Sequence, residues 1–202
     1  SDYSWTEKVC GMAAARDGSL SIGFGFGKYP NRNVVDGYGG ASRGVEQWTV
    51  RASRALASDP NRIDVGPLKY EVIEPLKRVR VVLEPNATQP VAFDLVLEGI
   101  VPCMLEERED RRNLHGFRHT ANQIRYHQTG SARGWVEVAG VRTEVTPETW
   151  IMTRDHSWGV RDWWSVGWVW TAGGLEDGTR FHTARVRVPG LERQDLLPPV
   201  HH

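Results

Sequence analysis

The segment Arg154–Gly159, with the sequence Arg-Asp-His-Ser-Trp-Gly, concentrates the side chains of this chain that can carry out acid–base chemistry. It combines a fixed cation, a carboxylate, an imidazole that titrates near neutral pH and a hydroxyl. Proton-transferring groups beside flat aromatic surfaces indicate a pocket for an apolar ligand rather than a plain structural core. Five of the nine tryptophans lie close together here: Trp158, Trp163, Trp164, Trp168 and Trp170.

Alternate side chains of an extended strand point to opposite faces. If this segment is a strand, Arg154, His156 and Trp158 share its more apolar face, which we expect to be the interior. Asp155 points the other way unless the strand bulges, and the neighbouring cation favours its ionised form, which makes it a poor acid. The predicted catalytic residues are therefore His156 as the proton carrier, Arg154 as a fixed charge or hydrogen-bond donor, and Asp155 as an orienting group.

A structural interpretation of the same residues stays open. An Arg-Asp-His cluster can hold strands together through buried hydrogen bonds without touching a ligand. Tryptophans at alternate positions are also most often core residues.

The same alternation predicts which further side chains face the ligand. It places Trp164, Trp168 and Trp170 on one face of a strand near 163–171, and it points His182 inward on a strand near 180–188. A register slip of one residue would reverse these faces. The predicted ligand-binding residues are Trp48, Trp158, Trp164, Trp168, Trp170 and His182.

Period-two alternation of apolar residues recurs along the chain and predicts an all-β protein. Leu20–Phe26 alternates large apolar residues with small ones, and its glycines leave room for the curvature of a barrel strand. Ala139-Gly140 predicts a hairpin between strands at 134–138 and 141–145. Roughly ten short strands with short loops predict an antiparallel barrel or sandwich, and the glycines favour the barrel.

Two stretches lack this alternation. Asp36–Gly40 is interpreted as a loop because it is rich in glycine. The region between Pro102 and Ala121 is interpreted as a long excursion with a helical turn, and it carries His115 and His119 at i, i+4 spacing, with His127 beyond. A metal site would need these ligands to converge, whereas histidines in loops are far commoner, so we predict no metal.

The composition narrows the classes of partner. The 202 residues include 25 Lys+Arg and 25 Asp+Glu, and this balance argues against a nucleic-acid partner. No apolar run approaches the roughly 20 residues that span a bilayer. The glycines at 23, 25 and 27 alternate within a strand and open no helix, so no nucleotide motif is present and we predict no cofactor.

The compartment is predicted from the first residues and the cysteines. Ser1–Lys8 lacks a basic segment followed by an apolar stretch, so we expect no signal peptide here, and removal of a signal before Ser1 stays open. Cys10 and Cys103 either pair or remain reduced thiols. Reduced thiols are favoured, which predicts a cytoplasmic protein.

Three motifs resemble a known family: Gly-Trp-Val-Glu-Val at 134–138, the segment Arg154–Gly159, and Glu-Asp-Gly-Thr at 176–179 followed by Phe181-His182. They are similar to the lipocalin-like group that includes carotenoid hydratases (hydroxyneurosporene synthases) and AttH-like proteins. The resemblance implies two lipocalin-like barrels with an apolar-ligand site in or between them. It also implies, in part, enzymes that protonate, hydrate or cyclise alkenes of isoprenoid or polyketide substrates.

Members of that group are commonly longer than this chain and carry the Arg-Asp-His-Ser-Trp-Gly segment near the join between barrels. We therefore expect residues 1–133 to form a lipocalin-like barrel. Residues 134–202, which carry the segment, should complete it or start a reduced second barrel. A second copy of the chain, in a homodimer, could complete a shared site.

The leading hypothesis is a cofactor-free acid–base enzyme, a hydratase/lyase or a cyclase-type isomerase, acting on an apolar terpenoid-like or polyketide-like molecule. Alkene protonation needs an acid in an apolar pocket, and indole faces can stabilise the resulting carbocation by about 1–2 kcal/mol each. The alternative is a non-catalytic lipocalin-like protein that binds such a ligand. A third hypothesis is a structural domain whose aromatic face serves dimerisation.

Overall fold

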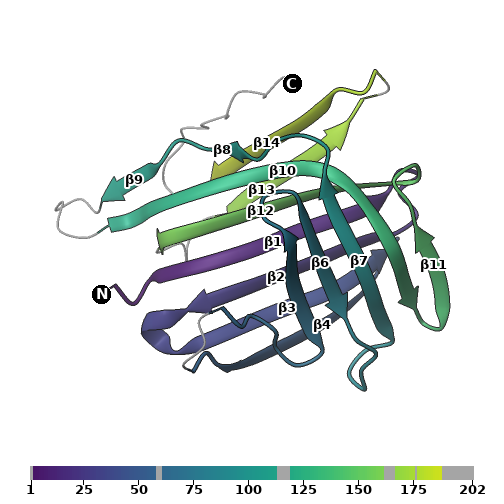
Figure 1. Cartoon of the computed structure of the whole chain (residues 1–202), viewed down its shortest axis with the longest axis horizontal. Helices are drawn as coiled ribbons and strands as arrows, with labels where there is room; N and C mark the ends of the chain where they lie inside the picture. Colours follow the sequence, from purple (N-terminus) through teal and green to yellow (C-terminus); the bar gives the residue numbers. More distant parts are fainter. Residues whose placement is uncertain (1, 58–60, 113–118, 162–166, 176, 188–202) are drawn as a thin grey trace. The chain divides into compact units, whose positions relative to one another are not determined.

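A computed structural model describes residues 2–57, 61–112, 119–161, 167–175 and 177–187 (Figure 1). The chain divides into two compact units, residues 1–161 and residues 162–202. Within the described residues, no helix has the length and apolar character needed to cross a membrane.

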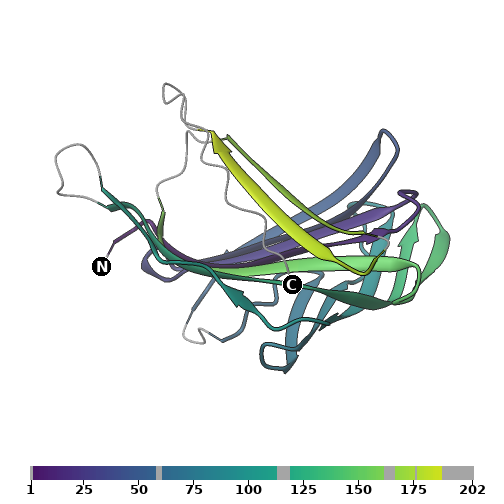
Figure 2. The same ribbon diagram turned by 90° about the horizontal axis from the view of Figure 1, so that it is seen from above.

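The first unit contains a twelve-stranded antiparallel sheet, which curls into a half-barrel (Figure 2). Its strand order is β4-β3-β2-β1-β12-β10-β7-β6-β5, and β8, β9 and β11 also pair with β10. A 3-10 turn, η1 (Pro30–Arg32), joins β2 to β3. The strands are β1 (Trp5–Ala15), β2 (Ser21–Tyr29), β3 (Val34–Arg43), β4 (Glu46–Ala55), β5 (Leu68–Glu74), β6 (Arg78–Leu83), β7 (Val91–Gly99), β8 (Met104–Leu105), β9 (Glu109–Arg112), β10 (His119–Val138), β11 (Val141–Val145) and β12 (Trp150–Arg161).

The second unit, as far as it is described, is an antiparallel hairpin of β13 (Gly167–Gly174) and β14 (Arg180–Arg187). Residues 134–161 belong to the same sheet as the strands before them. That residues 134–202 complete the barrel or start a reduced second one stays a prediction.

The predicted antiparallel all-β fold is confirmed, and the core follows the alternation in the sequence. The inward residues of β2 are large and apolar, and they are buried together with those of β6 and β7. The predicted hairpin is also present, with positive φ at Ala139 (51°) and Gly140 (79°), as a tight turn between β10 and β11 requires. The central buried residues are Ile22, Phe24, Phe26, Val79, Val81, Leu83, Phe93, Leu95 and Leu97.

The loop predicted at Asp36–Gly40 is wrong, because these residues lie within β3. Gly37 and Gly39 make room there for side chains from other elements. A Cβ atom at Gly39 would lie 2.7 Å from Leu68 Cδ2 and 3.2 Å from a ring carbon of Phe93, on β5 and β7. The curled sheet brings these strands close, which the local sequence pattern does not show.

The excursion predicted between Pro102 and Ala121 is also wrong in part. The described part of it forms β8, β9 and the start of β10, with no helical turn among those residues. β10 is a single strand of 20 residues that begins well before the strand predicted at 134–138, because it continues from its pairing with β12 into its pairing with β7. Strand β1 was not predicted.

The packing around Gly39 can be tested directly. Gly39→Val should lower the free energy of unfolding by about 1–3 kcal/mol, because the new side chain overpacks a filled interior. Gly23→Val, on the neighbouring strand β2, is the matched control, since nothing lies within 4 Å of a Cβ atom there. Chemical denaturation measures both values, and equal stabilities would contradict this account of β3.

Candidate active site

The register of three neighbouring strands brings distant polar residues to one face of the sheet. On β12, His156 lies opposite Val9 of β1 and opposite Tyr126 of β10. One step along the strand, Trp158 lies opposite Glu7, which itself pairs with Lys28 on β2. Paired residues of an antiparallel sheet point to the same face. These side chains therefore gather over the inside of the curled sheet.

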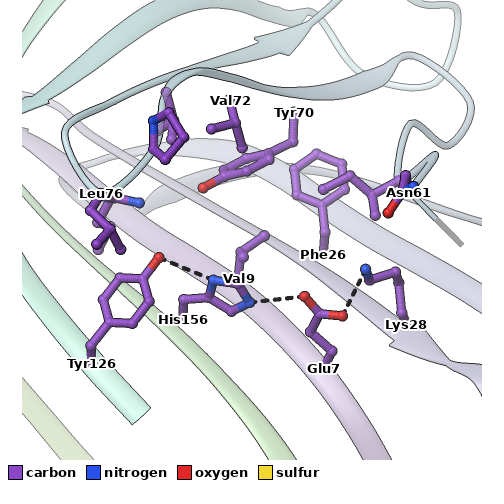
Figure 3. Close-up of a pocket in the computed structure, with 14 residues that line it drawn as sticks. Glu7, Val9, Phe26, Lys28, Asn61, Tyr70, Val72, Leu76, Tyr126 and His156 are labelled. Atoms are coloured by element: carbon purple, nitrogen blue, oxygen red, sulfur yellow. Dashed lines mark hydrogen bonds and ion pairs between the residues drawn. The ribbon is translucent and has the colours of Figure 1, made fainter. Parts of the chain in front are cut away.

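All of these side chains except that of Trp158 line a cavity of about 280 Å³ in the first unit (Figure 3). Its walls are mainly apolar and aromatic, and its polar groups come from β1, β2, β5, β10, β12 and the segment before β5. A mostly apolar cavity with a few convergent polar groups is typical of a small-molecule site. The lining residues are Glu7, Val9, Phe26, Lys28, Asn61, Ile63, Tyr70, Val72, Pro75, Leu76, Val79, Tyr126, Arg154 and His156.

A hydrogen-bonded chain of four residues crosses the floor of this cavity (Figure 3). Lys28 Nζ lies 2.7 Å from Glu7 Oε2, and Glu7 Oε1 lies 3.0 Å from His156 Nε2. On the other side of the imidazole ring, Nδ1 lies 3.1 Å from the hydroxyl of Tyr126. Both ring nitrogens of His156 are therefore engaged, one by a carboxylate and one by a phenol.

The charge on Glu7 determines which atoms donate and which accept along this hydrogen-bonded chain. The hydrogen bond from His156, followed by the pairing with Lys28, lowers the pKa of Glu7 to about 2 despite its partial burial. An ionised carboxylate can only accept, so His156 Nε2 carries a hydrogen and donates it to Glu7. When the imidazole is neutral, Nδ1 must then accept a hydrogen bond from the Tyr126 hydroxyl.

The two tyrosines of the cavity keep their protons at neutral pH. Burial raises the pKa of Tyr70 to about 12, and it raises the pKa of Tyr126 in the same direction. The guanidinium of Arg154 opposes both shifts without overcoming them. Tyr126 is therefore a neutral donor that can pass a proton only in step with His156.

The predicted interior face of β12 is confirmed for its polar residues. His156 and Arg154 both line the cavity. The indole of Trp158 packs against the ring of His156, with centroids 5.4 Å apart, and against the ring of Tyr126, with centroids 6.4 Å apart. Trp158 therefore packs beside His156 and Tyr126 and is not among the residues lining this cavity.

Asp155 lies on the opposite face of β12, as the alternation predicts. Cys10 Sγ donates to its Oδ1 over 3.4 Å, and Arg125 Nε lies 3.9 Å from its Oδ2. Burial and the nearby carboxylate of Asp155 raise the pKa of the Cys10 thiol. An orienting role of Asp155 toward His156 stays a prediction.

Of the remaining predicted ligand residues, Trp48 belongs to the first unit, and Trp164, Trp168, Trp170 and His182 belong to the second. Trp48 packs against the core of the first unit, with the guanidinium of Arg43 5.7 Å from its ring. In the second unit, the rings of Trp170 and His182 lie 5.7 Å apart. The backbone of Trp168 is in β13, and Trp164 lies outside the described residues.

The cysteines and histidines were the other predicted candidates. Cys10 and Cys103 are both free thiols. His127 pairs with Glu106 on the face opposite the cavity, and His115 lies outside the described residues. No group of three potential metal ligands occurs in the part of the chain that the structure describes.

Glu7, Lys28, Tyr70 and Tyr126 were not predicted as site residues. The alternation of Glu7 with Val9 in a strand was the available signal, because a carboxylate on an apolar face requires a partner. Tyr126 could be placed on one face of its strand, but its neighbour His156 is 30 residues away in the sequence.

Comparison with known proteins places the chain in a family and identifies its fold. Residues 1–177 match a family of unknown function (DUF8625), and the chain belongs to this family. No curated protein matches it in sequence. It is similar to the crystal structure of kievitone hydratase from Nectria haematococca, with a TM-score of 0.57 and 12% identity. This likeness covers 96% of the present chain and 64% of the other, and it confirms a lipocalin-like fold.

The depressed pKa of Glu7 predicts a pH-dependent contribution to stability. Because the pKa in the folded state is below the ordinary value of 4.5, ionised Glu7 stabilises the fold above about pH 4.5. This contribution is lost as the pH falls toward 2. Glu7→Gln should therefore lose less stability than the natural protein between about pH 5 and pH 2.5.

The measurement is the free energy of unfolding at both pH values. Glu46→Gln, at an exposed position at the start of β4, is the charge-matched control and should behave like the natural protein. If Glu7→Gln shows the full pH dependence, Glu7 is not held ionised by His156 and Lys28.

Proposed function

We propose that this protein is a hydratase or lyase that adds water to, or removes it from, an alkene of an apolar substrate bound in the cavity. The observation that carries the proposal is the chain Glu7–His156–Tyr126, which ends at a mainly apolar cavity. Such a chain can move a proton into the cavity. General acid–base catalysis of this kind contributes about 10²–10⁴-fold to a rate.

In the direction of addition, the reaction begins with His156 as an imidazolium ion. The Tyr126 hydroxyl gives its proton to one alkene carbon, and Nδ1 of His156 returns a proton to the phenol oxygen. The π electrons form the new C–H bond, and the other carbon becomes a cation. Water then forms the C–O bond, and its surplus proton passes back through Tyr126 to His156. The sum is alkene plus water giving alcohol, and the step requires no cofactor.

Glu7 and the aromatic rings lower the barriers of this sequence. The hydrogen bond to the carboxylate of Glu7 fixes the ring of His156 so that Nδ1 faces Tyr126. Phe26, Tyr70 and Tyr126 present ring surfaces to the cavity, where a carbocation gains about 1–2 kcal/mol from each face it contacts.

The resemblance to carotenoid hydratases and AttH-like proteins, together with the likeness to a hydratase structure, supports addition of water over cyclisation. Within the proposal, the substrate is terpenoid-like or polyketide-like. A second copy of the chain that completes a shared site stays a prediction.

A carrier that binds the same ligand unchanged is the second candidate. The observation that favours it is the open rim of the cavity, where the side chains of Val72 and Leu76 are 55% and 59% exposed although they line it. A carrier needs only such an apolar cavity. It does not need the ordered proton chain of His156.

Removal of the titrating groups tests the proposal. His156→Gln should lower turnover by about 10²–10⁴-fold, and Tyr126→Phe should do so by a similar factor, because each interrupts the proton path. Binding of the substrate should remain within about threefold, since both replacements keep size and shape. Steady-state kinetics and equilibrium binding measure the two effects separately.

Tyr29→Phe is the matched control for Tyr126→Phe, because the Tyr29 hydroxyl bonds to Asp36 and not to the chain in the cavity. It should leave turnover unchanged. Loss of turnover in Asp155→Asn with full turnover in His156→Gln would show that the roles are assigned wrongly. Binding without any turnover in the natural protein would favour the carrier.

A further inference from the structure

We infer that Arg154 binds an oxyanion of the ligand, so the cavity selects apolar molecules that carry a carboxylate or a phenolate. The inference rests on the proposed function for the reacting end of the ligand, whereas the binding step is independent of any turnover. It concerns the end of the cavity next to the proton chain.

Arg154 is a buried cation that is held in a fixed position. Its side chain lies on β12 with only 3% of the residue exposed, and it lines the cavity. Nε and one terminal nitrogen both donate to Gln128 Oε1, over 2.9 Å and 2.6 Å. The amide nitrogen of Gln128 in turn donates to the carbonyl oxygens of Leu76 (2.8 Å) and Val101 (3.0 Å). The backbone carbonyl groups therefore fix the amide of Gln128, and this amide fixes the guanidinium of Arg154.

The partners of Arg154 among the described residues are all neutral. Besides Gln128, they are the ring of Tyr126, 5.7 Å from the guanidinium carbon, the thiol of Cys103 at 3.9 Å, and Tyr70. Both tyrosines keep their protons, because burial raises the pKa of each. No carboxylate of the described residues pairs with this guanidinium.

The other charges near the cavity do not supply the missing partner. Glu7 is already shared between Lys28 and His156. Asp155 points to the opposite face of the sheet. The cavity therefore carries an excess positive charge that belongs to Arg154. A buried charge without a counter-charge is costly, and an entering anion would recover part of that cost.

The spacing of the two sites describes the ligand further. Arg154 and His156 are two residues apart on one face of a strand, so their positions differ by about 6.5–7 Å. A ligand whose oxyanion binds Arg154 would then place its reacting alkene about 6.5–7 Å from that oxyanion, beside Tyr126. Carboxylates and phenolates both present an oxygen acceptor to a guanidinium, and charge-assisted hydrogen bonds of this type are the stronger ones.

Two pairs of small ligands test the inference by isothermal titration calorimetry. The first pair is geranic acid and its methyl ester, and the second is umbelliferone and its methyl ether, measured where the phenol is ionised. The natural protein should bind at least one charged member about 10–100-fold more tightly than its neutral partner. If the protein prefers the charged member in the first pair alone, the oxyanion that it selects is a carboxylate. If it prefers the charged member in the second pair alone, the oxyanion is a phenolate.

Arg154→Met should abolish this preference while affinity for the neutral member stays within about threefold, since the apolar stem is retained. Arg51→Met, at an exposed position on β4, is the matched control and should keep the preference. Arg154→Lys, which keeps the charge but not the forked geometry, should show an intermediate preference. The comparison in the natural protein needs no variant, so a folding defect in Arg154→Met would leave the test intact.

Equal affinities for the charged and neutral members in the natural protein overturn the inference. So does a preference that persists in Arg154→Met, and so does failure of all four ligands to bind. His156→Gln should keep the preference. If it does and the natural protein turns over no alkene, the proposed function fails while the oxyanion site stands.

Discussion

The pairing register of β1, β12 and β10 is the constraint on which the rest of this structure depends. Because paired residues of antiparallel strands share a face, the register that sets His156 opposite Val9 and Tyr126 also places Glu7 within reach of the imidazole. The curvature of the sheet then closes apolar walls over these groups. A hydrogen-bonded chain at a mainly apolar cavity therefore follows from the alignment of these strands.

The same register separates two sets of charged residues. The cavity face carries His156 and Arg154, and the opposite face carries Asp155 with its partners Cys10 and Arg125. A shift of β12 by one residue would exchange these faces and put a carboxylate where the imidazole stands. The short segment with the most reactive composition thus serves two sides of one sheet, and only alternate residues belong to the proposed active site.

Local alternation was sufficient to predict the β fold, the inner face of β12 and the turn at Ala139-Gly140, because burial in a strand follows period two. It could not predict β3. A side chain at Gly39 would collide with side chains from β5 and β7, and these strands lie far away in the sequence. It also missed Glu7, which is 149 residues from His156. The contacts of these residues depend on sheet curvature and register, which no short window of sequence contains.

Solvent exchange at carbon tests the central claim most directly. The protein would be incubated in deuterium oxide with apolar alkenes that carry a carboxylate or a phenol, and the recovered molecules would be analysed by mass spectrometry. The account predicts that a bound alkene acquires one deuteron on carbon, in the alcohol or in the alkene re-formed from it. Saturable binding of these alkenes with no deuterium on carbon would contradict proton transfer by His156 and Tyr126.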